Sequence, residues 1–389
     1  MFAKRLKLNE DVSSTQTPVN QVGNSLVSVF RYGDTSLDDD WHPRRKRIYM
    51  DEVRHLYFVS DPDDKKKQTQ VAISGTGFKE MFFPKFDAIE TINTMFSRAR
   101  CTSHVYTLKK ESKSLYNMKT WNEIYNIFTG KLDADASAAN RGTKWHYLIE
   151  MYMKKHARAV NFDMVSMEQK ATYFLCPDAD HPTGKVDLEY TEFIGVSKLF
   201  VQVYEQYIVK QGWKPYASEM QMFDESVPGI VAGTADAVFS RTNKIGIEYL
   251  LVDWKTVSAS VNKDYGDQKH AFYPLHRFPN KKITHYSVQL NLYAYWLKTF
   301  YDVDIRHIKA ICFNLNEGTF EIVEIVYDAK LVSDIYQFYC SFLNRKKMFI
   351  EFNHGKDSLD VEKYPMSVYL PSTPAFTPAK PIERLDINN

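Results

Sequence analysis

Three apolar stretches in close succession constrain the fold of this chain most strongly. They lie at 216–223, 230–240 and 245–256, and turn-forming residues separate them at 227–229 (VPG) and 242–244 (TNK). Apolar runs of this length with such short connections predict three consecutive strands, each joined to the next by a tight turn. The chain is therefore expected to contain a sheet in which strands adjacent in sequence are also neighbours in space.

Residues with helical spacing precede and follow these strands. Trp145, Leu148, Ile149 and Tyr152 share one face of a predicted helix. The other predicted elements are helices at 191–210, 284–300 and 329–348 and strands at 305–314 and 319–327. This order predicts an α/β fold in which helices flank a mixed, partly antiparallel sheet.

The 389 residues are predicted to divide into four regions. These are a mobile polar and basic arm at 1–83, a helical region at 84–133, the main domain with a helical insertion at 134–350, and a proline-rich tail at 351–389. The basic runs at 44–47 (RRKR) and 65–67 (KKK) are either nuclear-localisation or phosphate-contacting patches, or an ordinary solvated surface.

Composition excludes several classes of protein. A net charge of +2 argues against affinity based on bulk positive charge. No apolar run approaches the ~18 residues of a membrane span, and the first residues lack the apolar segment of a signal peptide. The four cysteines are far apart, which argues against zinc ribbons and disulfide frameworks. An intracellular setting, cytoplasmic or nuclear, without a membrane partner is expected.

Charged residues lie on two of the three predicted strands. Asp236 ends the run GTAD on the second strand, and Asp253 and Lys255 belong to the run DWKT on the third. A tight turn between adjacent strands can bring both aspartates to one sheet edge, and the period of two places Asp253 and Lys255 on one face. Carboxylates suit Mg²⁺ or Mn²⁺, and a nearby ammonium stabilises developing charge in phosphodiester hydrolysis. The pattern predicts a metal-dependent hydrolytic site.

The Asp-x-Lys spacing alone indicates little, because four further pairs occur in this chain, among them Asp328 and Lys330. Its ordinary interpretation is an ion pair at a strand end, worth ~0–1 kcal/mol. However, only Asp253 and Lys255 both end an apolar strand and follow a strand with its own aspartate.

Three further groups are candidates for the same site. His146 and Glu150 lie one turn apart and off the apolar face of their helix, so His146 is a candidate ligand or half of a surface pair. Glu219 on the first strand is a candidate additional ligand or a partly exposed strand residue. Gln289 and Tyr293, one turn apart, either face the site or belong to a tyrosine-rich amphipathic helix.

The ordered set of motifs resembles the PD-(D/E)xK nuclease superfamily, in particular its RecB-like and lambda-exonuclease-like branch. The motifs are GTxxHxxxE at 142–150, a strand glutamate, GTAD at 233–236, DWKT at 253–256 and QxxxY at 289–293. They fall within residues 134–345, over half of the chain. The stretch 274–289 is also similar to stand-alone nucleases of large DNA viruses and phages.

The resemblance implies a restriction-endonuclease-like core and a hydrolase of phosphodiester bonds in double- or single-stranded DNA, more specifically an exonuclease. The metal ligands that it implies for Mg²⁺ or Mn²⁺ are His146, Asp236, Asp253 and the carbonyl of Trp254. The catalytic lysine that it implies is Lys255, and the other catalytic residues are Asp236, Asp253, Glu219, Gln289 and Tyr293.

Two features of some relatives are missing. The cysteines are not grouped as an iron–sulfur cluster requires, so no such cluster is expected. No GxxxxGK[ST] phosphate loop occurs, so no ATP hydrolysis is expected. A catalytically inactive nucleic-acid-binding or scaffold protein on the same fold, and an RNA endonuclease with the same chemistry, are the alternatives. Oligomeric state is left open.

The long polar connection at 258–282 mixes basic and aromatic residues. Such a composition suits a rim that guides a nucleic-acid strand, with an ordinary solvated loop as the alternative. The candidate nucleic-acid contacts are Lys263, Lys269, Arg277, Lys281 and Lys282.

Overall fold

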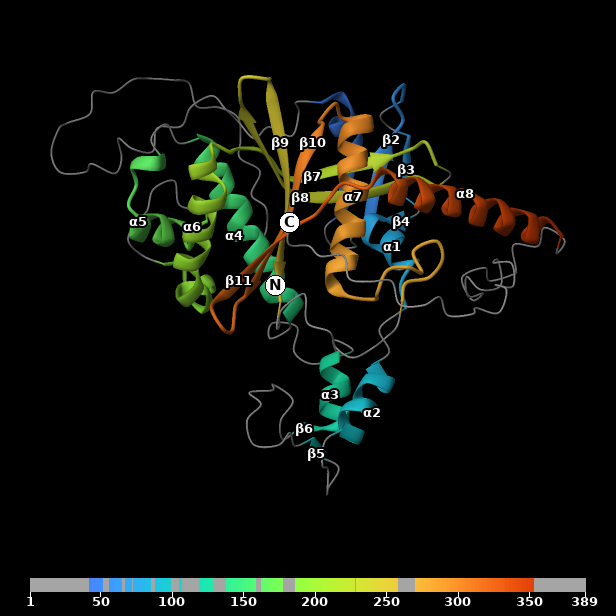
Figure 1. The fold of residues 1–389 in the computed structure, drawn as a ribbon, viewed down its shortest axis with the longest axis horizontal. Coiled ribbons are helices and arrows are strands. Elements are labelled where there is room, and N and C mark those ends of the chain that lie inside the picture. Colours follow the sequence, from blue (N-terminus) through green and yellow to red (C-terminus); the bar gives the residue numbers. More distant parts are fainter. Residues whose placement is uncertain are drawn as a thin grey trace.

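In the computed structural model, a mixed β-sheet lies between two layers of helices (Figure 1). This arrangement confirms the predicted α/β class with a mixed sheet flanked by helices. The structure describes residues 42–51, 56–64, 67–71, 73–84, 88–98, 105–106, 119–128, 138–158, 162–177, 186–227, 229–257 and 270–352.

The main sheet has the strand order β11-β10-β9-β8-β4, and β7 pairs with β8 as well. Its strands are β4 (Ile73–Ser74), β7 (Lys214–Asp224), β8 (Val231–Thr242), β9 (Ile247–Thr256), β10 (Ile305–Asn314) and β11 (Thr319–Glu324). The consecutive strands β7, β8 and β9 are antiparallel, as are β10 and β11. In contrast, β10 runs parallel to β9 and β4 runs parallel to β8. A parallel neighbour requires a crossover, which α7 (Lys282–Phe300) supplies between β9 and β10.

One edge of β8 has a gap between two partner strands. β7 pairs with β8 along residues 231–240 and occupies one edge. A strand has only two edges, so β9, which pairs with 237–242, and β4, which pairs with 231–232, share the other. Residues 233–236 lie between these two pairings. The candidate site is at this gap.

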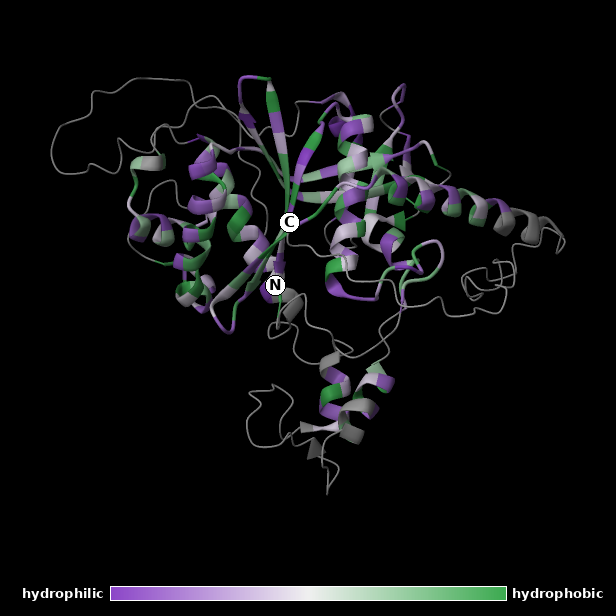
Figure 2. Cartoon of the chain, in the orientation of Figure 1, coloured by the Kyte–Doolittle hydropathy of each residue, from purple (hydrophilic) through white to green (hydrophobic). Residues whose placement is uncertain are grey.

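Each face of the sheet packs against its own set of helices. One face is covered by α4 (Ala138–Arg158), α5 (Met167–Phe174) and α6 (Ile194–Tyr207), and the other by α1 (Gly75–Glu80), α7 and α8 (Ala329–Phe352) (Figure 1). Leu250, Val252 and Trp254 are buried in the core under α4–α6, whereas Leu251 is buried in the core under α7. Because both faces are covered, the middle of each strand is a run of buried hydrophobic residues, at 250–252 in β9 and 310–313 in β10, and hydrophobic stretches are visible on both strands (Figure 2). The side chains of Asp253 and Lys255 therefore belong to the α7 face.

Part of the predicted mobile arm is folded. Residues 42–80 contain the 3-10 helix η1 (Pro43–Arg47), the antiparallel strands β1 (Ile48–Asp51), β2 (Leu56–Ser60) and β3 (Gln68–Gln70), and then β4 and α1. The expectation of a mobile arm is wrong for this segment, because β4 pairs with β8 and α1 packs against α7. Residues 1–41 lie outside the described residues.

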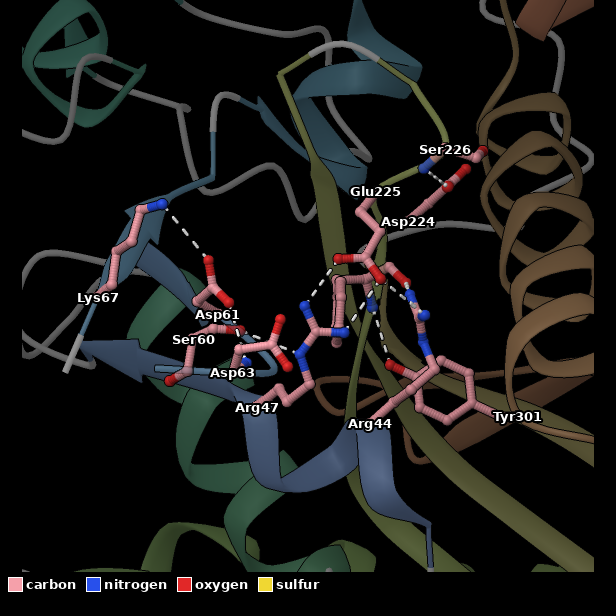
Figure 3. Close-up of polar contacts among 11 residues, drawn as sticks. Arg44, Arg47, Ser60, Asp61, Asp63, Lys67, Asp224, Glu225, Ser226 and Tyr301 are labelled. Carbon is pink, nitrogen blue, oxygen red and sulfur yellow. Dashed lines mark hydrogen bonds and ion pairs between the residues drawn. The ribbon is translucent and has the colours of Figure 1, made fainter. Parts of the chain in front are cut away.

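The basic run at 44–47 forms ion pairs within the fold (Figure 3). Arg44 Nη1 lies 3.0 Å from Glu225 Oε1, and Arg47 Nη2 lies 2.8 Å from Glu225 Oε2. The guanidinium of Arg44 also stacks over the ring of Phe223, 4.2 Å from its centroid. These contacts fix η1 to the end of β7. The alternative of a solvated basic surface is therefore wrong for Arg44 and Arg47. Lys65 and Lys66 lie outside the described residues.

The remaining elements are short. Within the predicted helical region 84–133 lie α2 (Ala88–Arg98) and α3 (Trp121–Phe128), together with an unpredicted pair of strands, β5 (Val105–Tyr106) and β6 (Lys119–Thr120). The 3-10 helices of the insertion are η3 (Phe162–Met164), η4 (Leu188–Phe193) and η5 (Val209–Gln211). Most of the proline-rich tail, 353–389, lies outside the described residues. Within the described part of the chain, no helix has the length and apolar character that crossing a membrane requires.

The partly buried His156 of α4 makes stability depend on pH. His156 stacks on Phe162, and its Nδ1 lies 2.9 Å from the hydroxyl of Tyr204. Burial, reinforced by the positive charges of Lys170 and Lys214, lowers the pKa of His156 to about 3. In the unfolded chain the pKa returns to about 6.5. Between these two values the unfolded state binds the extra proton, so acidification favours unfolding.

We expect His156 to reduce the free energy of unfolding by about 1–2 kcal/mol between pH 7 and pH 5. His156→Gln keeps a polar group near the Tyr204 hydroxyl but does not titrate, so this part of the loss should disappear. Urea unfolding of both proteins at the two pH values measures the difference. An equal loss in the wild type and the variant would contradict the assignment.

Candidate metal centre

Four elements bring charged side chains to the gap in β8. Continuing the β8–β9 register by one residue beyond Ala237 and Val252 places Asp236 opposite Asp253. The contributing residues are His146 from α4, Glu219 from β7, Asp236 from β8, and Asp253 and Lys255 from β9. The structure thus brings together Asp236, Asp253 and Lys255, as predicted from the sequence. It also brings His146 and Glu219, two of the further candidates, to the same place.

An imidazole and two carboxylates form the most compact part of this cluster. His146 Nδ1 lies 3.6 Å from Asp236 Oδ2 and 3.8 Å from Glu219 Oε1. One potential ligand atom from each of the three residues lies within 4.8 Å of the others. Burial alone lowers the pKa of His146, but the charges of Asp236 and Glu219 outweigh this effect and raise it. Such a group could hold a divalent cation.

The backbone at Glu219 is strained. Its φ of 48° lies in the left-handed region, which a residue with a side chain rarely adopts, although it is within a β-strand. Its neighbours in the β7–β8 register are paired regularly, Ser218 with Ala237 and Met220 with Ala235, so Glu219 lies opposite Asp236. Strain of about 1–3 kcal/mol persists where the surrounding structure enforces it, and often at functional sites. Here it accompanies a carboxylate that meets His146.

Asp253, which is buried, and Lys255, which is partly exposed, form an ion pair beside this group. Lys255 Nζ lies 2.9 Å from Asp253 Oδ1 and 4.0 Å from Asp236 Oδ2. Burial raises the pKa of Asp253 to about 6, although Lys255 counteracts the rise. For Lys255, burial lowers the pKa, but the charges of Asp253 and Asp236 raise it above its usual value. The ammonium is therefore held charged next to the two aspartates.

The second oxygen of Asp253 is a buried acceptor without a protein donor. Only 1% of Asp253 is exposed, and its Oδ2 has no hydrogen-bond partner among the described residues. An unsatisfied buried oxygen of an acidic group is costly unless water or a cation satisfies it. Together with the imidazole and carboxylate donors of His146, Glu219 and Asp236, this oxygen fits a bound divalent cation.

The backbone of Trp254 anchors Asp236. Its N–H donates a hydrogen bond to Asp236 Oδ2 at 2.8 Å. The indole points away from the site into the core under α4–α6. The resemblance implies that the carbonyl of Trp254 is a metal ligand. The backbone N–H of the same residue contacts the candidate metal centre through Asp236.

The two predicted residues of α7 contact each other and border the site. Gln289 Nε2 donates to the hydroxyl of Tyr293 at 3.2 Å, and both side chains are buried. Burial raises the pKa of the Tyr293 hydroxyl, and the charge of Asp253 adds to the rise. The phenol therefore stays protonated and available as a donor.

Tyr293 fits against the backbone of two glycines. A Cβ on Gly233 would lie 2.8 Å from Tyr293 Cε1, and a Cβ on Gly75 would lie 2.9 Å from the same atom. Both distances are shorter than van der Waals contact. The close approach of the buried Tyr293 ring to β8 therefore explains why position 233 is a glycine.

Gly233→Ala is expected to reduce the free energy of unfolding by about 1–3 kcal/mol, because the ring of Tyr293 has to move. Gly195→Ala is the matched control, since a Cβ there meets no atom within 4 Å. In helix α6 this substitution should be neutral or stabilise by up to ~1 kcal/mol. Denaturant unfolding compares the two variants, and a neutral Gly233→Ala would contradict the packing described.

Two site residues escaped the sequence prediction because they precede the predicted main domain. Lys79 of α1 is 8% exposed, and its Nζ lies 3.5 Å from Gln289 Oε1. Burial and the nearby charge of Lys255 lower the pKa of Lys79. A hydrogen bond of 2.9 Å joins the hydroxyl of Tyr57, in β2, to the hydroxyl of Thr234, which lies in the gap of β8. The sequence signal for Lys79 is limited to its position between Phe78 and the pair Phe82–Phe83, which indicates a buried surrounding.

Other candidates lie away from the centre. Glu150 is bonded to Lys154, so it does not form the surface pair with His146 that was the alternative prediction. Among the candidate nucleic-acid contacts, Lys281 and Lys282 lie at the start of α7, and Arg277 lies 4.0 Å from Asp328. Lys263 and Lys269 lie outside the described residues.

Comparisons with known proteins identify no family. No protein-family model matches the chain, and no curated protein matches it. Among solved structures, the crystal structure of SSO0001 is similar to 50% of this chain and 84% of that chain, with 14% sequence identity and a TM-score of 0.21.

Proposed function

We propose that this protein is a metal-dependent nuclease that hydrolyses phosphodiester bonds in DNA, on a core of the restriction-endonuclease-like type. The observation that supports this best is the convergence of the His146, Glu219 and Asp236 group with the Asp253–Lys255 pair at one gap in the sheet. The antiparallel strands β7–β9, followed by a crossover through α7 to the parallel β10, agree with the core that the motif resemblance implies.

His146, Glu219 and Asp236 would hold the cation, with Asp253 beside them. Carboxylate oxygens suit both Mg²⁺ and Mn²⁺, whereas an imidazole ligand favours Mn²⁺. When bound, the ion lowers the pKa of a coordinated water and offsets charge on the phosphate. The compact group includes Glu219, the candidate additional ligand of the sequence analysis, whereas Asp253, a ligand that the resemblance implies, lies outside this group and pairs with Lys255.

The chain's own cations bind and orient the phosphate. The ammonium of Lys255 is fixed by Asp253, and 22% of its side chain is exposed, so it is accessible to a substrate. From there it stabilises negative charge that develops on the phosphate during hydrolysis. Lys79 adds a second buried ammonium near Gln289, without a carboxylate within 4 Å among the described residues. A phosphate supplies the anion that this side chain lacks.

Cleavage of labelled nucleic acids tests the proposal. End-labelled linear duplex, single-stranded DNA, circular DNA and RNA are incubated with Mn²⁺, with Mg²⁺ and with chelator. We expect cleavage of DNA that requires the ion, and an exonuclease spares the circle. Cleavage of RNA alone would shift the substrate to RNA. Absence of any cleavage, without stabilisation by Mn²⁺, would leave a non-catalytic scaffold and refute the proposal.

His146→Gln is expected to weaken Mn²⁺ binding by at least about tenfold and Mg²⁺ binding by less, because the imidazole is the ligand that favours the softer ion. His307→Gln is the control, since His307 lies on β10 with 41% of its side chain exposed, beside Glu248. Isothermal titration of each ion without DNA gives the affinities. Unchanged Mn²⁺ affinity in His146→Gln would exclude His146 as a ligand.

A further inference from the structure

The described part of the 258–282 connection exposes aromatic rings in a well-ordered loop. Phe272 is 47% exposed and Tyr273 is 57% exposed. Large exposed apolar side chains that lie next to each other often mark an interaction site. Residues 270–281 are therefore a candidate interaction surface.

Hydrogen bonds within the loop, and one to the segment that follows α1, hold the backbone of residues 270–281 in place. Ala271 N donates to Phe278 O at 3.0 Å, Leu275 N donates to Phe272 O at 2.7 Å, and Phe272 N donates to Phe82 O at 2.7 Å. A β-bridge joins the two ends of the loop at His270 and Pro279. A ligand that binds here does not have to order the backbone, so little conformational entropy is lost.

The ring of Tyr273 is fixed on one side and open on the other. It packs edge-on against the buried Phe338, with centroids 5.8 Å apart, and lies nearly parallel to the ring of His276 at 9° and 5.8 Å. Phe272 is its neighbour in the chain. We call Phe272, Tyr273 and His276 the aromatic platform.

The surroundings of the platform favour an anionic partner. From 268 to 301 the chain contains no aspartate or glutamate. The same segment provides Arg277, which is 45% exposed and lies 4.0 Å from the partly exposed Asp328, and it provides Lys281 and Lys282 at the start of α7. Aromatic rings among cations, without acidic residues in the same segment, match a nucleic-acid strand better than an apolar protein surface.

A series of backbone and ring contacts leads from the loop to α7, the helix that carries Gln289. Phe83 stacks on His285 at 3.7 Å, and His285 precedes Gln289 by one turn of α7. Phe82, which accepts the hydrogen bond from Phe272, follows α1, the helix that carries Lys79. The platform loop and Lys79 are therefore attached to the same segment of the chain, which ends α1 and packs on α7.

We propose that the aromatic platform stacks against unpaired bases of the substrate, so that the protein binds DNA with a single-stranded stretch in preference to blunt duplex. The inference rests on the proposed function, because it specifies the form of the nuclease's substrate. Stacking accepts every base, since each has a π-face, and it requires that the base is not paired within a duplex.

Fluorescence anisotropy with a labelled single-stranded oligonucleotide and a labelled blunt hairpin, both in chelator, tests the platform without cleavage. Tyr273→Ala should weaken binding of the single strand about 5- to 100-fold and binding of the blunt hairpin less than about twofold. Tyr273→Phe should bind like the wild type. Tyr49→Ala is the matched control, because Tyr49 is 56% exposed and stacks on Phe58 in the separate sheet of β1 and β2.

Four results would overturn the inference. They are unchanged single-strand affinity in Tyr273→Ala, an equal loss for the hairpin, an equal loss in Tyr49→Ala, and an altered sedimentation mass with unchanged affinity, which would indicate a contact between copies of the chain. Because binding is measured in chelator, selective loss in Tyr273→Ala supports the platform even if cleavage is never observed. The reverse result, cleavage by a protein whose platform variants bind normally, rejects the platform alone.

Discussion

Asp236→Asn is expected to reduce ion-dependent cleavage of DNA by on the order of 10³-fold, which corresponds to ~4 kcal/mol of transition-state stabilisation. Asp236 Oδ2 lies 3.6 Å from His146 Nδ1 and 4.0 Å from Lys255 Nζ, so this carboxylate joins the proposed ligand group to the lysine. The substitution removes its charge and leaves its size nearly unchanged. Initial rates with saturating Mn²⁺ measure the effect.

The fold should tolerate this change. The amide oxygen of asparagine can still accept the hydrogen bond that Trp254 N donates to Asp236. We therefore expect the free energy of unfolding of the metal-free protein to change by less than about 1 kcal/mol. Stabilisation by Mn²⁺ should be lost at the same time. The combination of intact folding and lost activity separates a ligand from a structural residue.

Asp304→Asn is the matched control for the loss of a carboxylate. Asp304 pairs with Lys298 at 2.9 Å, and half of its side chain is exposed, away from the gap in β8. Its cleavage rate should equal that of the wild type. An Asp236→Asn protein that keeps more than about a tenth of the wild-type rate would contradict the assignment of the site.

Asp253 and Lys255 give a less direct test, although both were expected to be essential. Lys255, which is partly exposed, neutralises the buried Asp253 at 2.9 Å. Removal of one partner leaves an uncompensated buried charge, which typically costs about 3–5 kcal/mol. Loss of activity in Asp253→Ala or Lys255→Ala would therefore combine misfolding with lost chemistry, unless stability is measured on the same samples.

The strands and helices of the second half of the chain were predictable because their apolar patterns are long. β10 was predicted at 305–314 and lies there, and α7 begins two residues before its predicted start at 284. The folded segment at 42–80 was not predictable in the same way. Its strands are two to five residues long, and all three residues of β3 are exposed. Such strands depend on pairing with distant residues rather than on their own pattern.

The same distinction applies to the candidate site. Asp236, Asp253 and Lys255 meet because a tight turn joins their strands, and a tight turn is visible in sequence. The left-handed backbone at Glu219 is not visible in sequence, because no glycine marks it and it lies inside a strand that pairs in regular register with β8 on both sides of this residue. Lys79 enters through α1, far from the motifs in sequence, and only the fold places it beside Gln289.

The position of α4, the helix that carries His146, depends on a cluster of rings in the core between the sheet and α4–α6. Phe200 of α6 is fully buried and lies within 6.0 Å, between ring centroids, of rings in α4, α5, α6, β9 and β10. Those rings belong to Trp145, Tyr152, Phe174, Tyr204, Trp254 and Phe313. Trp145 precedes His146 in α4, and Trp254 lies between Asp253 and Lys255, so this cluster also supports the candidate metal centre from the α4–α6 side of the sheet.

Phe200→Ala is expected to reduce the free energy of unfolding by about 3–5 kcal/mol, because it removes buried apolar surface and leaves a cavity among rings that cannot all close it. Phe200→Leu fills most of that volume and should cost less than half as much. Leu188→Ala in η4 is the control, since Leu188 is 87% exposed and should change stability by less than about 0.5 kcal/mol. Urea unfolding at pH 7 measures all three. A loss below about 1 kcal/mol in Phe200→Ala would show that α4 is held against the sheet by other contacts, and His146 would then be positioned independently of this cluster.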